Sequence, residues 1–308
     1  MTKKVLLATE KPFAAEAVEQ IKQISDGAGY QLVLLEKYTE KSQLLQAVAD
    51  ADAMIIRSDI VDGEVLDAAK QLKIVVRAGA GYDNIDLAAA TAHNVVAMNT
   101  PGQNSNAVAE LAIGMMIFQA RKQFNGKSGS ELKGKTLGLH AYGNVGKCVA
   151  AIAKGFGMEI YAFDPYIAKE TIEADGVHCV ESVKELYEKS QYISLHIPAN
   201  AETKKSIGYD LLMSMPKPAT LVNTARKEVV KEEDLLKVFA DRGDFQYLSD
   251  IAPECAAEIQ ENFSGRFFFT PKKMGAQTEE ANVNAGLAAI RQIIDFFEKG
   301  DVRFQVNK

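Results

Sequence analysis

The 308-residue sequence is poor in cysteine and histidine, with three and four residues respectively. Cys148, Cys179 and Cys255 are odd in number and far apart, so they suggest no disulfide framework and favour reduced thiols. Neither the cysteines nor the histidines have the spacing of zinc ligands. We therefore expect no bound metal.

Long hydrophobic runs and an excess of positive charge are also missing. No apolar stretch reaches the roughly 20 residues that span a membrane, and the opening MTKKVLLATEKPF is too short for the apolar core of a signal peptide. The net charge of −6 and the pI near 5.4 argue against general nucleic-acid binding and leave room for a local basic pocket. We expect a cytoplasmic protein with no nucleic-acid or membrane partner.

What the sequence does have is a regular alternation of short apolar runs with helix-like spacing. Buried strands are predicted in the first hundred residues at 4–9, 31–36, 53–57, 73–77 and 94–98. A second series is predicted at 136–142, 158–164, 192–198, 219–225, 245–250 and 266–270. Strands that alternate with helices indicate parallel sheets covered on both faces. The fold class is therefore α/β, with two doubly wound parallel-sheet domains.

The domain boundaries follow from the breaks between these series. A Pro-Gly turn and a long helix rich in Ala, Met and Leu begin near residue 100, and a lone amphipathic helix at 278–300 follows the last strand. That helix has no sheet of its own, so we expect it to pack across the hinge or back on the first unit. We predict a discontinuous domain of residues 1–99 plus 276–308 and a second domain of residues 100–275.

The most specific local motif is a glycine-rich turn that joins a strand to a helix. It has the G-x-G-x-x-G pattern with Ala141 in place of the first glycine, and Asp164 ends the next strand. Such a turn binds a pyrophosphate at the helix N-terminus, and the acid accepts hydrogen bonds from the adenosine ribose. A carboxylate there repels a 2′-phosphate, so the pattern favours NAD over NADP. The predicted contacts are Tyr142, Gly143, Asn144, Val145, Gly146 and Asp164.

Three arginines stand at predicted strand ends, where ligands of parallel sheets gather. They are Arg57, Arg77 and Arg226, and the small residues Ala78, Gly79, Ala80 and Gly81 after the second of them leave backbone N–H groups for a carboxylate. Ser58 and Asn104 are further polar candidates, and Asn104 also suits a helix cap.

Taken in order, several segments resemble the D-isomer-specific 2-hydroxyacid dehydrogenases over essentially the whole chain. They are RAGAGYDNID, MNTPGQNSNAVAE, AYGNVG with Asp164, LHIP, VNTARKEVV and TPKKMGAQT. The resemblance implies a flavodoxin-like substrate domain, a Rossmann NAD-binding domain, a cleft between them that holds the active site, and a homodimer built through the NAD-binding domain. Longer members carry a serine-sensing C-terminal domain that is not found before Lys308, so allosteric inhibition is left open.

The resemblance also implies residue roles. Arg226 would bind the carboxylate and carbonyl oxygen of the substrate, and Asp250 would face the nicotinamide carboxamide. Arg57 and Arg77 would hold the other anionic end of the substrate. The remaining implied cofactor contacts are His196, Pro198, Thr224, Ala225 and Gly275.

The sequence departs from the family at the acid–base pair, which is usually a histidine and a glutamate. Counted from Gly275, the histidine position holds Lys273; counted from Pro271, it holds Lys272, because one residue is inserted. We favour Lys273, since the following helix fixes the geometry. The usual glutamate position falls on Cys255, with Glu254 one residue earlier. A lysine amine has an ordinary pKa of about 10.4, so it needs neighbouring cations and desolvation rather than a carboxylate partner. We hypothesise that Lys273 is the proton acceptor and that Glu254 is peripheral.

Within the family, the motifs are most similar to members that act on a phosphorylated substrate. The expected activity is NAD-dependent oxidation of D-3-phosphoglycerate to 3-phosphohydroxypyruvate, the first step of L-serine biosynthesis. One alternative is another 2-hydroxy acid, such as those of the glyoxylate/hydroxypyruvate and D-lactate enzymes. The other is a non-catalytic NAD-sensing protein, which the missing histidine and glutamate would fit.

Overall fold

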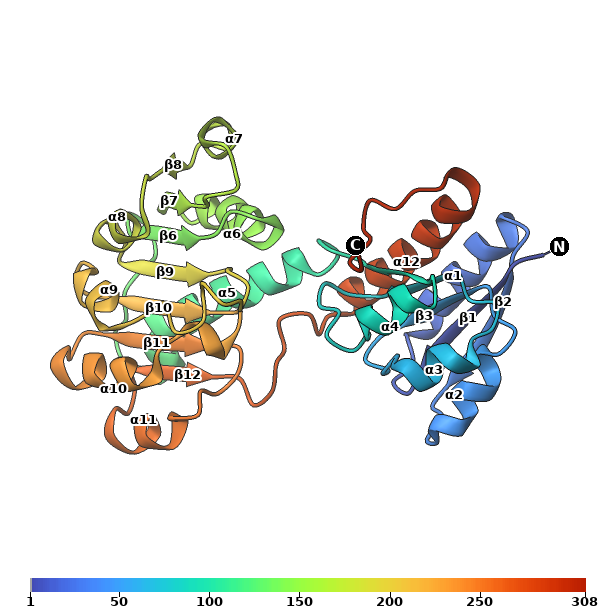
Figure 1. Cartoon of the computed structure of the whole chain (residues 1–308). Coiled ribbons are helices and arrows are strands. Elements are labelled where there is room, and N and C mark those ends of the chain that lie inside the picture. Colours follow the sequence, from blue (N-terminus) through green and yellow to red (C-terminus); the bar gives the residue numbers. More distant parts are fainter. Residues whose placement is uncertain (1) are drawn as a thin grey trace. The chain divides into compact units, whose positions relative to one another are not determined.

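The computed structural model describes residues 2–308 and divides the chain into two units. The first consists of Met1–Asn104 and Thr278–Lys308, and the second of Ser105–Gln277. Each unit contains one parallel sheet with helices on both faces (Figure 1). The predicted α/β class with two parallel-sheet domains is therefore confirmed.

The sheet of the first unit has five parallel strands in the order β2-β1-β3-β4-β5. The strands are β1 (Lys4–Thr9), β2 (Gln31–Glu36), β3 (Ala53–Ile56), β4 (Ile74–Arg77) and β5 (Val96–Asn99). This is the flavodoxin-like order, in which the direction of winding reverses between β1 and β3. The crevice at the carboxyl ends of these two strands is where such a sheet binds ligands.

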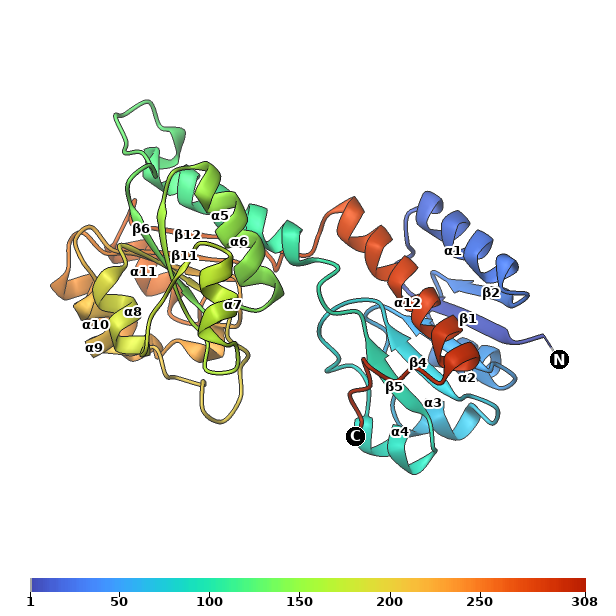
Figure 2. The same ribbon diagram turned by 90° about the horizontal axis from the view of Figure 1, so that it is seen from above.

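The helices of the first unit form two layers. They are α1 (Ala15–Gly27), α2 (Lys41–Val48), α3 (Gly63–Ala68), α4 (Leu87–Ala92) and α12 (Glu279–Lys299). One face of the sheet packs on α1 and α12, and the other on α2, α3 and α4. Helix α12 lies beside α1, as both views of the chain show (Figure 2), and contacts β3 and β4. The helix returns to the first sheet because its buried stripe, which includes Ala289, Ile290 and Ile293, completes that core.

Both ends of α12 are capped. The Thr278 hydroxyl accepts a hydrogen bond from the Ala281 N–H at the start. Gly300 ends the helix in the left-handed conformation, with φ = 67°. The tail beyond it runs back to β5, where Asn307 accepts a hydrogen bond from the Ala97 N–H. Both ends of the second segment of this unit are thus held by specific hydrogen bonds.

The sheet of the second unit has seven parallel strands in the order β12-β11-β10-β9-β6-β7-β8. The strands are β6 (Thr136–His140), β7 (Glu159–Phe163), β8 (His178–Cys179), β9 (Tyr192–Leu195), β10 (Thr220–Asn223), β11 (Gln246–Ser249) and β12 (Phe267–Phe269). Winding reverses between β6 and β9, which places the expected dinucleotide crevice at their carboxyl ends.

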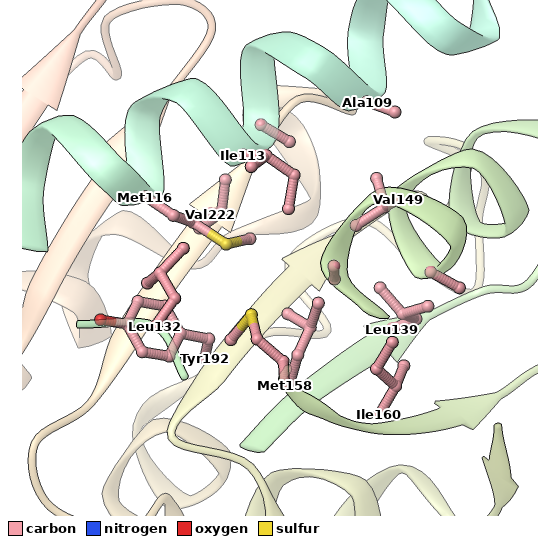
Figure 3. Packing of buried hydrophobic residues seen from close by; sticks show 14 of the residues in the cluster. Ala109, Ile113, Met116, Leu132, Leu139, Val149, Met158, Ile160, Tyr192 and Val222 are labelled. Atoms are coloured by element: carbon pink, nitrogen blue, oxygen red, sulfur yellow. The ribbon is translucent and has the colours of Figure 1, made fainter. Parts of the chain in front are cut away.

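Two helical layers cover this second sheet as well. The helices are α5 (Ser105–Ala120), α6 (Asn144–Gly155), α7 (Lys169–Ala174), α8 (Val183–Lys189), α9 (Tyr209–Ser214), α10 (Glu232–Asp241) and α11 (Ala256–Asn262), with short 3₁₀ turns at Lys122–Phe124 and Lys227–Val229. The layer of α5 and α6 packs on one face through residues such as Ile113, Val149 and Leu139 (Figure 3), and α8 to α11 pack on the other.

Several elements of the second unit were not among the predicted ones, namely β8 and α7 to α11. Each of these spans ten residues or fewer, too short for a periodic pattern to stand out from the loops around it. Among residues 2–308, no helix is long and apolar enough to cross a membrane.

Candidate functional site

The turn after β6 has the backbone of a dinucleotide-binding motif, although alanine occupies its first position. Ala141 has φ = 84°, in the left-handed region that favours glycine, which costs an L-residue about 1–2 kcal/mol. A Cβ on Gly146 would lie 2.6 Å from the Ala141 carbonyl oxygen, so only glycine lets α6 start this close to the strand. A Cβ on Gly143 would meet no atom of residues 2–308 within 4 Å. The turn is therefore open on one side and tightly packed on the other.

The open side carries the unpaired N–H groups at the start of α6. Gly143 is the N-cap of this 12-residue helix, and no side chain caps it. The first N–H groups of a helix have no partner within the helix, and they favour a negatively charged group. This end of α6 can therefore accept a phosphate without any change in the backbone.

Asp164 closes the turn at the end of the neighbouring strand, as the sequence predicts. Its Oδ2 accepts a hydrogen bond of 2.8 Å from the Tyr142 N–H, and its Oδ1 accepts one of 2.9 Å from the Tyr166 N–H. A carboxylate oxygen has two acceptor sites, so each oxygen can accept a second bond from a ribose hydroxyl. The Asp164 side chain is thus fixed in position and still able to bind.

Two histidines lie at the strand ends beside this turn. Burial lowers the pKa of His140 to about 4, and burial together with His140 lowers that of His196 to about 3. The His196 ring is half-buried as a whole, but its Nε2 is buried and has no hydrogen-bond partner among the described residues. Both rings are therefore neutral near pH 7. His196 also lies near the turn, since its Cδ2 would be 3.8 Å from a Cβ on Gly146.

The predicted catalytic cations of the second unit meet at one carbonyl oxygen. Nη1 of Arg226 and Nζ of Lys273 each donate to the Ala225 oxygen at 3.1 Å. The distance between these two nitrogens therefore cannot exceed the sum of the two hydrogen-bond lengths. Asn223 holds this turn, because its side chain accepts from the Ala225 N–H and donates to the Arg226 carbonyl, both at 3.0 Å.

Asp250 organises the segment that carries Lys273. It is 2% exposed, and its Oδ1 accepts from the Thr270 hydroxyl at 3.0 Å and the Met274 N–H at 2.7 Å. Its Oδ2 accepts from the Gly275 N–H at 2.7 Å, and a Cβ on Gly275 would lie 2.9 Å from that oxygen. Both carboxylate oxygens are thus used to shape the segment after β12. Lys272 and Lys273 are both exposed, and Lys273 is the one that contacts Ala225.

Glu254 forms an ion pair with Lys227, a partner other than the two predicted catalytic cations. Its carboxylate pairs with Nζ of Lys227 at 3.0 Å and is 79% exposed, and that bond lowers its pKa. Glu232 accepts from the N–H groups of Glu254 and Cys255, and burial and this carboxylate raise the pKa of the Cys255 thiol to about 12. Lys227, Glu254 and Cys255 line a cavity of about 590 Å³ that opens beside α10.

In the first unit, Arg57 lies at the end of β3 and reaches across to the turn after β1. Its Nη1 donates to the Lys11 and Pro12 carbonyls at 3.3 and 3.2 Å, and its Nη2 donates to Asn282. The guanidinium also lies 4.9 Å from the centre of the Phe13 ring. These contacts fix Arg57 at the β1/β3 crevice, where this type of sheet binds ligands.

Arg77 and the small residues after it form one structural group. Nε of Arg77 donates to the Arg57 carbonyl at 3.0 Å, and a Cβ on Gly79 would collide with the Arg77 guanidinium. Gly79 also has φ = 154°, so both space and backbone require glycine there. The N–H groups of Ala80 and Gly81 have no hydrogen-bond partner among residues 2–308, which leaves two donors for an anion.

The remaining predicted site residues lie at strand ends or in the segments that follow them. Ser58 and Pro198 are exposed, Asn104 is half-buried, and Thr224 is buried with an unpaired hydroxyl oxygen. Among the residues described, no group of three or more His, Cys, Asp or Glu could hold a metal ion.

Sequence reasoning missed the residues that support these side chains. Asp59 is 2% exposed and accepts from the N–H groups of Glu10 and Arg57 and from the Tyr38 hydroxyl. Asn84 donates to the Arg57 carbonyl. Asn84 lies inside the quoted segment RAGAGYDNID, and Asp59 lies two residues after Arg57. Apart from the Arg57 N–H that donates to Asp59, the partners of these two side chains lie 21 to 49 residues away, and no local pattern indicates them.

Residues 107–263 match the family model described as "D-isomer specific 2-hydroxyacid dehydrogenase, NAD binding domain". The match covers half of the chain and includes the turn after β6 and Asp164. The chain belongs to the D-isomer-specific 2-hydroxyacid dehydrogenases. The family recognised in the motifs is thereby confirmed.

This chain is similar in sequence to curated D-3-phosphoglycerate dehydrogenases and to a hydroxypyruvate reductase. A D-3-phosphoglycerate dehydrogenase of Methanocaldococcus jannaschii is 35% identical over 82% of this chain and 51% of its own length. A hydroxypyruvate reductase of Thermotoga maritima is 31% identical over 85% of this chain and 90% of its own length. The chain thus spans about half the length of the D-3-phosphoglycerate dehydrogenases that it matches.

Among solved structures, an NAD⁺-bound 3-phosphoglycerate dehydrogenase of Entamoeba histolytica has a TM-score of 0.87 and 49% sequence identity. The similarity covers 100% of this chain and 99% of that one. NAD is the cofactor of the family's domain, and the residues of this chain fit it. The open side of Gly143, the start of α6 and the Asp164 carboxylate offer what a pyrophosphate and a ribose diol need.

Proposed function

We propose that this dehydrogenase oxidises D-3-phosphoglycerate to 3-phosphohydroxypyruvate with NAD, and that this reaction begins L-serine biosynthesis. The proposal rests most on one observation: Arg226 and Lys273 donate to the same carbonyl oxygen, that of Ala225. Arg226 can bind the carboxylate and the carbonyl oxygen of a substrate, while Lys273, a few ångströms away, exchanges a proton with it. Both requirements belong to 2-hydroxy acid oxidation.

The phosphorylated substrate is supported by the charges of the first unit. D-3-phosphoglycerate carries about three negative charges at pH 7, because a phosphomonoester contributes nearly two. Arg57 and Arg77 lie at neighbouring strand ends and are joined through the Arg57 carbonyl. Guanidinium groups pair well with phosphate, and the free N–H groups of Ala80 and Gly81 suit a further anionic oxygen.

The roles of the residues follow from this arrangement. NAD, when bound, supplies the acceptor for the hydride that leaves C2 of the substrate. Lys273, as a neutral amine, takes the proton of the C2 hydroxyl, and Arg226 stabilises the carbonyl oxygen that develops. Asp250 keeps the Lys273 segment in place through its bonds to Met274 and Gly275. Glu254 takes no part in the proton transfer in this scheme, because its carboxylate pairs with Lys227.

The test is the reverse reaction, NADH oxidation, with a panel of 2-keto acids. We expect kcat/KM for 3-phosphohydroxypyruvate to exceed that for hydroxypyruvate, glyoxylate or pyruvate by at least tenfold. The variant Arg77→Ala should reduce this preference, because it removes one phosphate partner. A preference for hydroxypyruvate in the unaltered protein would overturn the proposed substrate. No NADH oxidation with any of the four acids would overturn the enzymatic role and favour an NAD-sensing protein.

We further propose a homodimer built through the second unit. Helix α5 is apolar nearly all the way around its axis, as in SNAVAELAIGMMIFQA, and such helices are usually buried on all sides. Phe124, just beyond this helix, is 64% exposed. Light scattering coupled to size-exclusion chromatography should give twice the mass of one chain. The Phe124→Glu variant should shift the measured mass toward that of a single chain.

A further inference from the structure

Ala141 occupies a position that favours glycine, and something must hold the strained turn in place. Its φ of 84° belongs to the left-handed region, where an L-residue persists only if the surrounding structure imposes it. In the usual motif a glycine adopts this conformation without cost. The turn that would bind the pyrophosphate of NAD therefore depends, in this chain, on contacts made by its neighbours.

The next residue, Tyr142, makes those contacts. Its ring is completely buried, and its N–H donates to Asp164 at 2.8 Å. Its hydroxyl donates to Oδ2 of Asp175 at 3.0 Å. Asp175 is the C-cap of α7, an element outside the turn. The side chain of Tyr142 thus links the turn to a second element, and its backbone links the turn to the predicted ribose-binding acid.

The Asp175 bond is more than an incidental surface contact. The residue after Ala141 cannot turn outward without pulling a buried phenol out of the core of α5, α6 and β6. Lys147 of α6 also lies over this ring, 5.9 Å from its centre. As long as the hydroxyl is bound to Asp175, rotation of the ring and relaxation of the turn toward negative φ are opposed from two sides.

We propose that Tyr142, through its hydrogen bond to Asp175, is a positioning residue that holds the Ala141 turn in the conformation that binds NAD. The bond takes the place of the missing first glycine. We assign the phenol no contact with NAD. Its effect is transmitted through the backbone N–H groups at the start of α6, which move if Ala141 relaxes.

A double-mutant cycle tests this proposal by NAD affinity alone. The variants are Tyr142→Phe, Ala141→Gly and the two together, and the dissociation constant for NAD is measured by calorimetry without substrate. We expect Tyr142→Phe to weaken binding five- to tenfold. In the Ala141→Gly background the same change should alter the constant less than twofold, because glycine needs no support at positive φ.

The matched control is Tyr161→Phe on β7. This tyrosine also donates to a carboxylate, that of Glu159 at 2.6 Å, and it lies outside the turn. It should leave NAD affinity within twofold of the unaltered protein. If Tyr142→Phe folds poorly, Asp175→Ala breaks the same bond from the exposed partner and leaves the buried ring in place.

The outcomes separate this proposal from the proposed function, since no turnover is measured. Weaker NAD binding in Tyr142→Phe or Asp175→Ala that Ala141→Gly restores supports it. Unchanged NAD binding in both variants overturns it. A loss that persists in the Ala141→Gly background also overturns it, because the phenol would then support the domain in general rather than the strained turn.

Discussion

The two sheets can be compared at the same topological position, the turn after the strand where winding reverses. After β6, the small residues of AYGNVG leave N–H groups open to an anion. After β1, the residues EKPFA present carbonyl oxygens instead, and those of Lys11 and Pro12 accept from Arg57. One turn attracts a negatively charged group directly, and the other fixes a cation that can do so. Equal topology therefore does not give equal chemistry, which depends on the turn residues.

The largest effect should come from removing Lys273, the proposed proton acceptor in the second unit. We expect Lys273→Ala to lower the single-turnover rate of hydride transfer about 1,000-fold, within the range for a lost acid–base group. NAD affinity should stay within threefold. The measurement is rapid mixing of enzyme and NAD with substrate, followed by NADH absorbance.

Lys272→Ala is the matched control for this prediction. Both lysines are exposed and adjacent, but Lys273 is the one bonded to Ala225, so the Lys272 variant should lose less than threefold. A loss below tenfold in Lys273→Ala would contradict the assignment. So would a severe loss in Glu254→Ala alongside a dispensable Lys273.

The units should also respond differently to acid, because their histidines have opposite environments. The pKa values of His140 and His196 in the second unit are lowered to about 4 and about 3, whereas an unfolded histidine titrates near 6.5. Between pH 6.5 and about 4 the unfolded chain binds protons that the folded unit does not, so the free energy of unfolding falls as pH falls. The loss is on the order of 3 kcal/mol for His140.

His93 in the first unit should act in the other direction. The Ala89 carbonyl and Asp67 raise its pKa, so its contribution is present below pH 6.5 and is lost as pH rises through the raised value. The test is urea unfolding at pH 7.5 and pH 5.0, followed by circular dichroism since the chain has no tryptophan. His140→Asn with His196→Asn should reduce the difference between the two pH values, and His93→Gln should not. Equal pH dependence in all three proteins would contradict the prediction.

The smallest effects should come from a pair of glycines, one in each unit. A side chain on Gly146 meets the Ala141 carbonyl, so Gly146→Val should weaken NAD binding about 50-fold, roughly the 2 kcal/mol expected for overpacking. A methyl group on Gly79 displaces the Arg77 guanidinium, so Gly79→Ala should raise KM for the substrate about tenfold with NAD affinity unchanged. Titration calorimetry and steady-state kinetics measure the two constants. Loss of NAD binding in Gly79→Ala would break the proposed division of roles.

Much of this architecture could be predicted from local patterns. The predicted strands at 4–9 and 31–36 coincide with β1 and β2, and Gly300 ends α12 as its position indicates. These features depend on neighbours in sequence: apolar runs, turn residues and caps act over fewer than about ten residues. The glycine-rich turn and Asp164 could likewise be predicted, because the residue types and their spacing identify the motif without any knowledge of the contacts that support it.

What the sequence by itself determined is therefore the order of the strands other than β8 and of the longer helices along the chain, the family motifs and the chemical types of the site residues. Tertiary structure alone decided which of them meet. Lys273 and Arg226 are 47 positions apart and share one carbonyl oxygen, while Glu254 pairs with Lys227. The Tyr142 hydroxyl bonds to Asp175, 33 residues away. Such contacts arise from the packing of whole elements, which brings side chains together at distances in sequence that no local pattern encodes.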